Sequence, residues 1–205
     1  ANLDRIPAGV EIVFTDMSAG MVAEAQKNLA TAANHFTFET ANIASLHFAD
    51  NSFDRVTANH MLYHVPDIDL AIGEVRRVLK PDGLFIAATN GESHLVELSE
   101  IGRILAPNSH WETHIKMTSY LSFNLENGAA YIKAHFNSAT LHKHNSSLAV
   151  TEFEPLLAYL TSYNNIRPHI TTASLAAARQ YYAHILEQND GVFPIQKATG
   201  LFRAA

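Results

Sequence analysis

The sequence predicts an α/β protein with a Rossmann-like, doubly wound and mostly parallel sheet, and three observations support this class. Over roughly the first ninety residues, segments rich in apolar and β-branched side chains alternate with segments of helical periodicity. Residues 10–15 form a nearly continuous apolar run, as in a strand that is covered on both faces. The order strand, helix, strand, strand, helix, strand indicates parallel strands with helices packed against them.

The first two strands are expected at residues 10–15 and 36–43, with a helix between them. Ser18 lies where this helix needs an N-cap, because its hydroxyl can accept a hydrogen bond from the first turn. Apolar side chains then recur at every fourth position, so one face of the helix can be buried. After the turn residues 50–52, a third strand is expected at residues 53–58.

The second helix is expected to begin after Asp67, which can cap it, and to end in the sequence KPDG at residues 80–83. Proline cannot continue the helix, and Gly83 is expected to take the left-handed turn that ends it. The strand at residues 84–89 follows directly.

The second half of the chain is predicted to be more helical and less regular. An Asn-Asp-Gly turn at residues 189–191 leads into the last strand. The helices expected here are residues 94–105, 127–136, 153–163 and 172–188, and the late strands are residues 139–144 and 192–203.

Composition limits the class of protein before any motif is considered. The chain has 205 residues, 47% of them hydrophobic and 17% charged, and is expected to form a single domain over residues 1–205. A formal charge of -6 without a basic run argues against a nucleic-acid partner. The absence of cysteine excludes disulfides, thiolate metal sites and a cysteine nucleophile. Because no apolar run is long enough to cross a bilayer and no secretory leader is found, we expect a soluble, cytoplasmic protein without a membrane partner.

Asp16 ends the first predicted strand and precedes a helix, and this position has two interpretations. In an open parallel sheet, ligands bind beyond the carboxyl ends of the strands, where a carboxylate can accept two hydrogen bonds from a ribose diol. Alternatively, the carboxylate only stabilises the positive end of the helix behind it, by about 0.3–1 kcal/mol. Position alone does not separate these interpretations.

Three segments carry a resemblance to a known family. They are VEIVFTDMSAGMVAEAQKNL, ANIASLHFADNSFDRVTANHMLYHV and EVRRVLKPDGLFIAATNG, and together they span residues 9–91. In this order and spacing they resemble three successive motifs of class I S-adenosylmethionine-dependent methyltransferases of the small-molecule type. SFDRV followed by LYHV and LKPDG is the most specific combination. The last portion, from NGAAYIKAHF to FPIQKATGLFRA, is similar to the C-terminal region of small-molecule members.

The resemblance implies the cofactor S-adenosylmethionine and residues that bind it. Asp16 would hold the ribose hydroxyls and Met17 would pack against the adenine, the alternatives being helix capping and core packing. Asn42 stands where the family usually has an acid that accepts from the adenine amino group. Its amide oxygen can still accept, or Asn42 is an ordinary turn residue. Ile43 would offer its backbone N–H to the ring.

Asn59 and His60 follow the strand after which the family's backbone passes close to the methionine part of the cofactor. His64 would face the methyl side of the cleft and is the candidate catalytic residue. Methyl transfer from a sulfonium is an in-line displacement, so alignment supplies most of the acceleration, and a base is needed only if the acceptor must lose a proton. An imidazole can serve as that base; otherwise His64 only shapes the pocket.

Twelve histidines invite a metal hypothesis, which their spacing does not support. His110 and His114 are four positions apart, but the glutamate between them is misplaced for the zinc-protease motif. His142 and His144 share a strand face, and no third ligand lies near either pair in the sequence. We expect surface or pocket-lining histidines and no metal.

The family's first strand and its glycine-rich turn would precede the predicted strand at residues 10–15, and the chain begins too late to contain them. The family's sheet has the order 3-2-1-4-5-7-6 with strand 7 antiparallel, so this strand would lie in the middle. Without it, the strands at residues 10–15 and 53–58 expose unpaired backbone groups. A truncated fragment is the favoured explanation. Alternatively, another segment or a second copy, as in a homodimer, fills the gap, or these two strands pair directly.

Residues 92–127 are expected to form a helical lid over the methyl acceptor. Within them, Trp111, Tyr120 and Phe123 would suit a modest apolar or aromatic molecule, or equally a plain core. The sequence does not identify the acceptor.

The predicted function is methyl transfer to a small-molecule acceptor. One alternative is a non-catalytic, methyltransferase-like module that binds or dimerises, or an inactive fragment. A nicotinamide-linked dehydrogenase also places an acid after its second strand, but LKPDG and the paired strands at the end argue against it. Calorimetric titration with S-adenosylmethionine and with NAD separates these classes, and a version extended at the N-terminus separates the fragment from the non-catalytic module.

Overall fold

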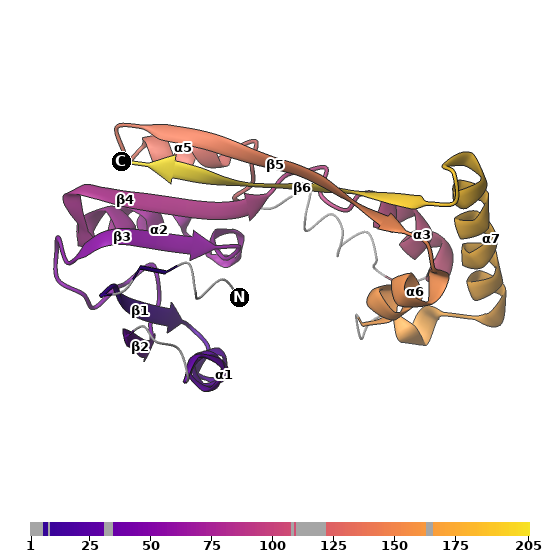
Figure 1. The fold of residues 1–205 in the computed structure, drawn as a ribbon, viewed down its shortest axis with the longest axis horizontal. Helices are drawn as coiled ribbons and strands as arrows, with labels where there is room; N and C mark the ends of the chain where they lie inside the picture. The colour runs from indigo at the N-terminus through magenta and orange to yellow at the C-terminus, as the bar shows by residue number, and fades with distance from the viewer. Residues whose placement is uncertain (1–5, 8, 31–34, 108, 110–121, 163–165) are drawn as a thin grey trace.

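The computed structural model describes residues 6–7, 9–30, 35–107, 109, 122–162 and 166–205. Strands and helices alternate in its first half, as predicted (Figure 1). The strands are β1 (Glu11–Asp16), β2 (His35–Thr40), β3 (Phe53–Asn59), β4 (Leu79–Asn90), β5 (Ala139–Val150) and β6 (Phe193–Ala204). The helices are α1 (Ala19–Leu29), α2 (Ile68–Val78), α3 (Glu97–Leu105), α5 (Gly128–Lys133), α6 (Phe153–Thr161) and α7 (Thr172–Gln188), with the short 3-10 helices η2 (Leu62–His64) and η3 (Arg167–His169).

Polar caps set the starts of three helices. Ser18 caps α1 and Asp67 caps α2, each through a side-chain oxygen that accepts from a backbone N–H of the first turn. α7 begins with a reciprocal capping box between Thr171 and Ser174. The first two caps lie where the sequence predicted them, so local chemistry decides where these helices begin.

The strands form two sheets in the part of the chain that is described. β1 and β2 pair in parallel, and Asp16 lies opposite Thr40. The other sheet has the order β3-β4-β6-β5, in which β3 and β4 are parallel and β6 is antiparallel to both of its neighbours. This arrangement confirms the predicted sheet order, with the antiparallel strand in its expected place and a gap where the central strand would lie.

The gap separates β1 from β3. These two strands do not pair in the described residues, so the alternative in which they close directly on each other is wrong. In Figure 1 the arrowheads of β1 and β3 point in the same direction. β1 has β2 as its sheet partner and β3 has β4, so each presents one unpaired edge within the described chain.

Two hydrophobic cores hold the fold together. The first packs α2 and α5 against the sheet and includes the fully buried Phe85 and Phe202. The second joins α3, α6 and α7 to the distal parts of β5 and β6 and includes Leu160 and Phe193. The long strands β5 and β6 run from one region to the other (Figure 1). The first core therefore lies against β3 and β4, whereas the second lies where β5 ends and β6 begins.

β5 is longer than predicted. The expected strand stopped at residue 144, but β5 continues to Val150, which pairs with Phe193 at the start of β6. The prediction ended too early because residues 144–147 are polar and carry no apolar alternation. Cross-strand pairing with β6, which local sequence does not report, sets the length.

Two predicted helix boundaries were wrong for backbone reasons. The helix expected from residue 94 begins at Glu97, because Leu95 has a φ of 58° and cannot belong to a right-handed helix. The predicted left-handed turn at Gly83 does not form; Gly83 lies in β4. Glycine is needed there because an added Cβ would lie 2.9 Å from the Lys80 carbonyl oxygen.

Candidate functional site

The predicted site residues lie at or just after the carboxyl ends of β1, β2 and β3. β1 and β2 end in register, and the Ala41 N–H donates to the Asp16 carbonyl oxygen at 3.1 Å. This bond brings the turn that contains Asn42 beside the end of β1. Parallel pairing thus gathers the first group of predicted residues at one edge of a sheet.

Asp16 is half-buried, and its carboxylate takes part in the turn that starts α1. Oδ1 accepts from the Ser18 N–H at 2.8 Å, and Ser18 in turn caps the helix through Met21 N–H. One oxygen of the Asp16 carboxylate therefore helps to form the start of α1, as the alternative to ribose binding expected. Since a carboxylate has two oxygens, each with two lone pairs, this bond leaves acceptor capacity for a diol. The role in ribose binding stays a prediction.

The two apolar residues of the first group differ in exposure. The Met17 side chain is 72% exposed, so core packing, the alternative for this residue, is wrong. Ile43 is partly buried and packs against the first core. Asn42 forms a turn in which its Oδ1 accepts from the Ala44 N–H at 3.0 Å, as its turn interpretation expected. Contacts of Met17, Asn42 and Ile43 with an adenine stay predictions.

Asn59 is the last residue of β3 and His60 follows it, and both residues are exposed. The His60 N–H donates to the Ala88 carbonyl oxygen at 3.0 Å, which continues the ladder between β3 and β4 by one bond. His60 then has a φ of 50°, in the left-handed region that non-glycine residues seldom adopt. Strained backbone of this kind persists where the surrounding structure holds it, often at functional sites.

His64 ends the short helix η2, and its side chain is exposed. Its ring lies edge-on to the Tyr63 ring, with centroids 4.5 Å apart. Burial raises the pKa of the Tyr63 phenol, so this group stays protonated near neutral pH. The Ser122 hydroxyl donates to the Tyr63 carbonyl oxygen at 3.2 Å and joins η2 to the segment before α5. Exposure leaves the imidazole of His64 accessible, and its catalytic role stays a prediction.

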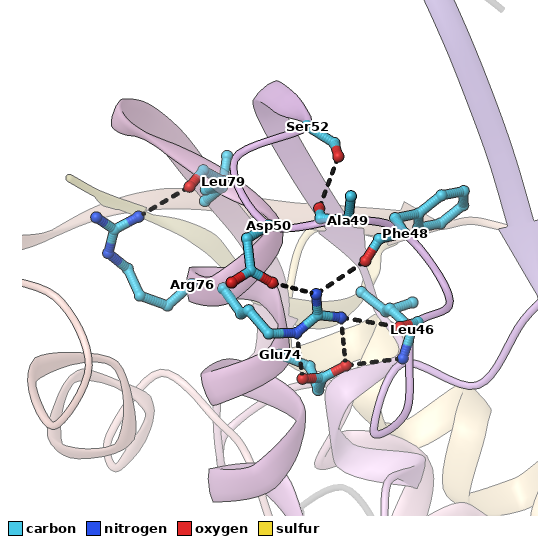
Figure 2. Close-up of polar contacts among 9 residues, drawn as sticks. Leu46, Phe48, Ala49, Asp50, Ser52, Glu74, Arg76 and Leu79 are labelled. Atoms are coloured by element: carbon cyan, nitrogen blue, oxygen red, sulfur yellow. Dashed lines mark hydrogen bonds and ion pairs between the residues drawn. The ribbon is translucent and has the colours of Figure 1, made fainter.

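Arg77 ties the connection between β2 and β3 to α2, a contact that the sequence did not predict. Its guanidinium donates to the carbonyl oxygens of Leu46 and Phe48, both at 2.8 Å, and pairs with Asp50 at 2.7 Å. Glu74 accepts from Arg77 at 2.7 Å and from the Leu46 N–H at 2.9 Å (Figure 2). These bonds anchor the chain that leaves the first group of site residues.

The segment before α5 covers the carboxyl end of β4. The Leu125 N–H donates to the Asn90 carbonyl oxygen at 3.1 Å, and the buried Thr89 hydroxyl donates to the Phe123 carbonyl oxygen at 2.9 Å. The Phe123 side chain is fully buried in the first core, so its core interpretation is the one observed. Trp111 and Tyr120 lie outside the described residues.

Two searches of the described residues concern metal binding and membrane spans. The described residues contain no group of three or more histidine or acidic side chains arranged to hold a metal ion, and His110 and His114 lie outside them. His142 and His144 are exposed on β5. Within the described chain, every helix is too short or too polar to cross a bilayer.

Sheet order, the antiparallel β6 and an acid at the end of β1 define a Rossmann-like protein of the class I methyltransferase type. Residues 2–87, which are less than half of the chain, match the family described as "Methyltransferase domain", and this match agrees with the resemblance that the motifs carry. The resemblance predicted from the motifs is confirmed.

Curated relatives carry methyltransferase names. The chain is 29% identical to malonyl-[acyl-carrier protein] O-methyltransferase of Methylovorus sp. over 64% of its own length and 44% of that protein. It is 37% identical to the ubiquinone/menaquinone biosynthesis C-methyltransferase UbiE of Paracoccus denitrificans over 40% of its own length and 33% of that protein. The chain thus spans less than half the length of these relatives.

Solved structures support the fold. A putative methyltransferase from Bacillus halodurans superposes with a TM-score of 0.61 at 13% identity, over 95% of this chain and 82% of that one. The phosphoethanolamine N-methyltransferase 2 of Haemonchus contortus was solved with S-adenosylhomocysteine. It superposes with a TM-score of 0.55 at 17% identity, over 96% of this chain and 44% of that one. The [4+2]-cyclase SpnF superposes with a TM-score of 0.53 at 16% identity, over 95% of this chain and 66% of that one. Proteins with this fold therefore also carry out other reactions.

Proposed function

We propose that this chain binds S-adenosylmethionine and takes part in transfer of its methyl group to a small-molecule acceptor. The observation that carries the proposal is the position of Asp16 at the carboxyl end of β1, with acceptor capacity left on its carboxylate. The family match over residues 2–87 supports it, because that stretch contains β1, β2 and β3 with the turns that follow them.

In this proposal Asp16 accepts from the ribose hydroxyls and the exposed Met17 side chain covers the adenine. Asn42 and Ile43 lie beside the base, whereas Asn59 and His60 lie beside the methionine part. The bound cofactor supplies an electrophilic methyl group, and the protein aligns the acceptor with it. His64 stands near the reacting end, where its imidazole takes a proton from an acceptor that must lose one.

The relatives do not agree on the kind of acceptor. Their names specify O-, C- and N-methylation, so the acceptor atom of this chain is not fixed by similarity. A lid formed by residues 92–127 belongs to the same proposal. α3, within this range, packs into the second core, and residues 108 and 110–121 lie outside the described residues.

Isothermal titration calorimetry tests the proposal. S-adenosylhomocysteine should bind the chain and NAD should not, because the site is proposed for a methyl donor. Binding of NAD alone would replace the methyltransferase assignment with that of a dehydrogenase. Binding of neither would refute the proposal for this chain.

A second candidate function, a non-catalytic module that dimerises, is favoured by one observation. β1 and β3 each present an unpaired edge in the described chain, and such edges pair readily with another strand. Sedimentation equilibrium together with calorimetry separates this candidate from the enzyme. The non-catalytic module requires a dimer that binds no S-adenosylhomocysteine, whereas binding of S-adenosylhomocysteine favours the enzyme.

A further inference from the structure

The two faces of the sheet β3-β4-β6-β5 differ in how they are covered. Side chains alternate between the faces along each strand, and residues opposite each other in register share a face. One such row across the sheet is Ala58, Ala87, Phe202 and Leu141, and it packs into the first core with α2 and α5. This face is therefore covered by helices.

The neighbouring positions of the same strands form the opposite face, which we call the open face. Its rows in register are Arg55 and Leu84; Thr57, Ile86, Arg203 and Thr140; Asn59, Ala88, Leu201 and His142; Asn90, Thr199 and His144; and Lys197 with Ser146. Among the described residues, none of the apolar side chains in these rows belongs to either core. Leu201 is 36% exposed and Ile86 is half-buried.

The same face is covered farther along β6. Phe193 and Ile195 are separated from Leu201 by even numbers of residues, so they lie on its face of the strand, and both are buried in the second core with α3 and α7. Helices of the described chain thus cover this face where β6 begins and leave it open toward the end of the strand. Sheets with parallel strands usually carry helices on both faces, so the open face is suited to a further helix.

Three cations frame the apolar centre of the open face. Arg55 lies on β3, and Lys197 and Arg203 lie on β6. The register rows of this face contain no acidic residue, and the cations that pair with carboxylates in the described chain are others, such as Arg77 and Lys80. The open face is therefore positive, although the chain has a formal charge of -6. An acidic occupant complements it, whereas a second copy would bring like charges together.

The apolar centre has the width of one helix. Ile86 and Ala88 on β4 and Leu201 on β6 span two neighbouring strands, which lie about 4.8 Å apart, and a helix with its side chains is about 10 Å across. We propose that the open face docks an amphipathic helix of a partner protein, with its apolar stripe on these three side chains and its acidic flanks toward Arg55 and Arg203. This inference does not rest on the proposed function.

Fluorescence anisotropy with synthetic peptides tests the inference on the intact chain. The probe is an acidic amphipathic peptide of about 18 residues, long enough to form a helix, with leucine on one face and glutamate beside it. One control peptide has lysine in place of every glutamate, and another has the acidic sequence scrambled so that the stripe is lost. The acidic peptide should bind at least about tenfold tighter than either control, and added salt should weaken it. If it binds no tighter than the controls, the inference is wrong.

Substitutions on the open face locate the binding. Arg203→Glu should weaken the acidic peptide and strengthen the lysine peptide, a reversal that loss of folding cannot produce. Lys133→Glu, at an exposed position of α5, should change neither. Leu201→Thr should weaken the acidic peptide about threefold or more, and Leu148→Thr, near the other end of β5, should not. An Arg203→Glu protein that binds both peptides as wild type does would overturn the inference.

Two other occupants would each replace the proposed one. Sedimentation equilibrium should show no dimer that Arg203→Glu dissociates, because such a dimer would fill the open face with a second copy. Flotation with vesicles of phosphatidylserine and with vesicles of phosphatidylcholine should show no binding to either. Binding to phosphatidylserine vesicles that Arg203→Glu abolishes, without a preference among the peptides, would assign the open face to an anionic membrane surface and overturn the inference.

Discussion

Glu74 and Arg77 form a two-point ion pair on the last turns of α2. Arg77 donates from Nε to one oxygen of Glu74 at 2.7 Å and from Nη2 to the other at 2.8 Å. A planar guanidinium bound at two points is fixed in orientation. Its remaining donors therefore point reliably at the carbonyl oxygens of the chain between β2 and β3.

Removing this side chain should destabilise the fold. Arg77→Ala leaves the carbonyl oxygens of Leu46 and Phe48 without their donor, and we expect the free energy of unfolding to fall by clearly more than in a control variant. Urea denaturation measures the change. Arg55→Ala, on an exposed position of β3, is the control and should cost no more than about 0.5 kcal/mol. Equal losses in the two variants would show that the contacts of Arg77 contribute nothing.

The same ion pair should make stability depend on pH in the acid range. Arg77 holds the pKa of Glu74 below its ordinary value of 4.5. The folded chain therefore binds this proton less readily than the unfolded chain, so the stabilisation is complete above that value and is lost as pH falls through the folded pKa. We expect the stability difference between wild type and Glu74→Gln to be larger at pH 6 than at pH 3. A difference that is constant between these pH values would contradict the linkage.

Gly200 should not tolerate a side chain. An added Cβ would lie 2.7 Å from the His142 carbonyl oxygen, which is backbone of the neighbouring strand, so β5 and β6 would have to separate. We expect Gly200→Ala to cost about 1–3 kcal/mol, as overpacked sites do. The control is Gly20→Ala in α1, where the nearest atom is 3.6 Å away and alanine is the better helix former. Thermal unfolding should rank Gly20→Ala at or above wild type and Gly200→Ala well below it.

His94→Phe should remove a pH dependence near neutrality. The pKa of His94 is lowered in the folded chain, where Lys197 and His60 add to the effect of burial, so protons bind preferentially to the unfolded chain below about pH 6.5. Wild-type stability should therefore rise between pH 5 and pH 8, and His94→Phe should flatten that rise while His142→Phe preserves it. Chemical denaturation across this range measures the effect, and identical slopes in all three proteins would contradict the burial of a neutral imidazole.

Much of the first half of the fold could be predicted from the sequence, because its signals are local. Apolar runs mark β1 and β4, Ser18 and Asp67 mark the starts of two helices, and the motifs gave the order of the sheet. Asp16 and Asn42 were placed at the edge where they lie because parallel strands share a carboxyl end.

The features that were missed depend on residues far apart in the chain. From the sequence alone, Arg77 is one of several cations expected on the surface of a helix. Its contact with the Leu46 carbonyl oxygen forms only when the chain folds. His94 reads as the start of a helix, because nothing local reports the left-handed Leu95 or the approach of β6. The full length of β5 was hidden for the same reason: its last residues are strand because β6 pairs with them.

Asp16→Asn offers the most direct test of the central claim, that this carboxylate binds the ribose of a methyl donor. Asparagine keeps an oxygen for the Ser18 N–H, so the turn and the melting temperature should be preserved, while the charge needed for a diol is lost. We expect calorimetry to show affinity for S-adenosylhomocysteine at least about tenfold weaker than in wild type, and unchanged affinity in the control Asp82→Asn near the opposite end of β4. Wild-type affinity in Asp16→Asn would contradict the claim.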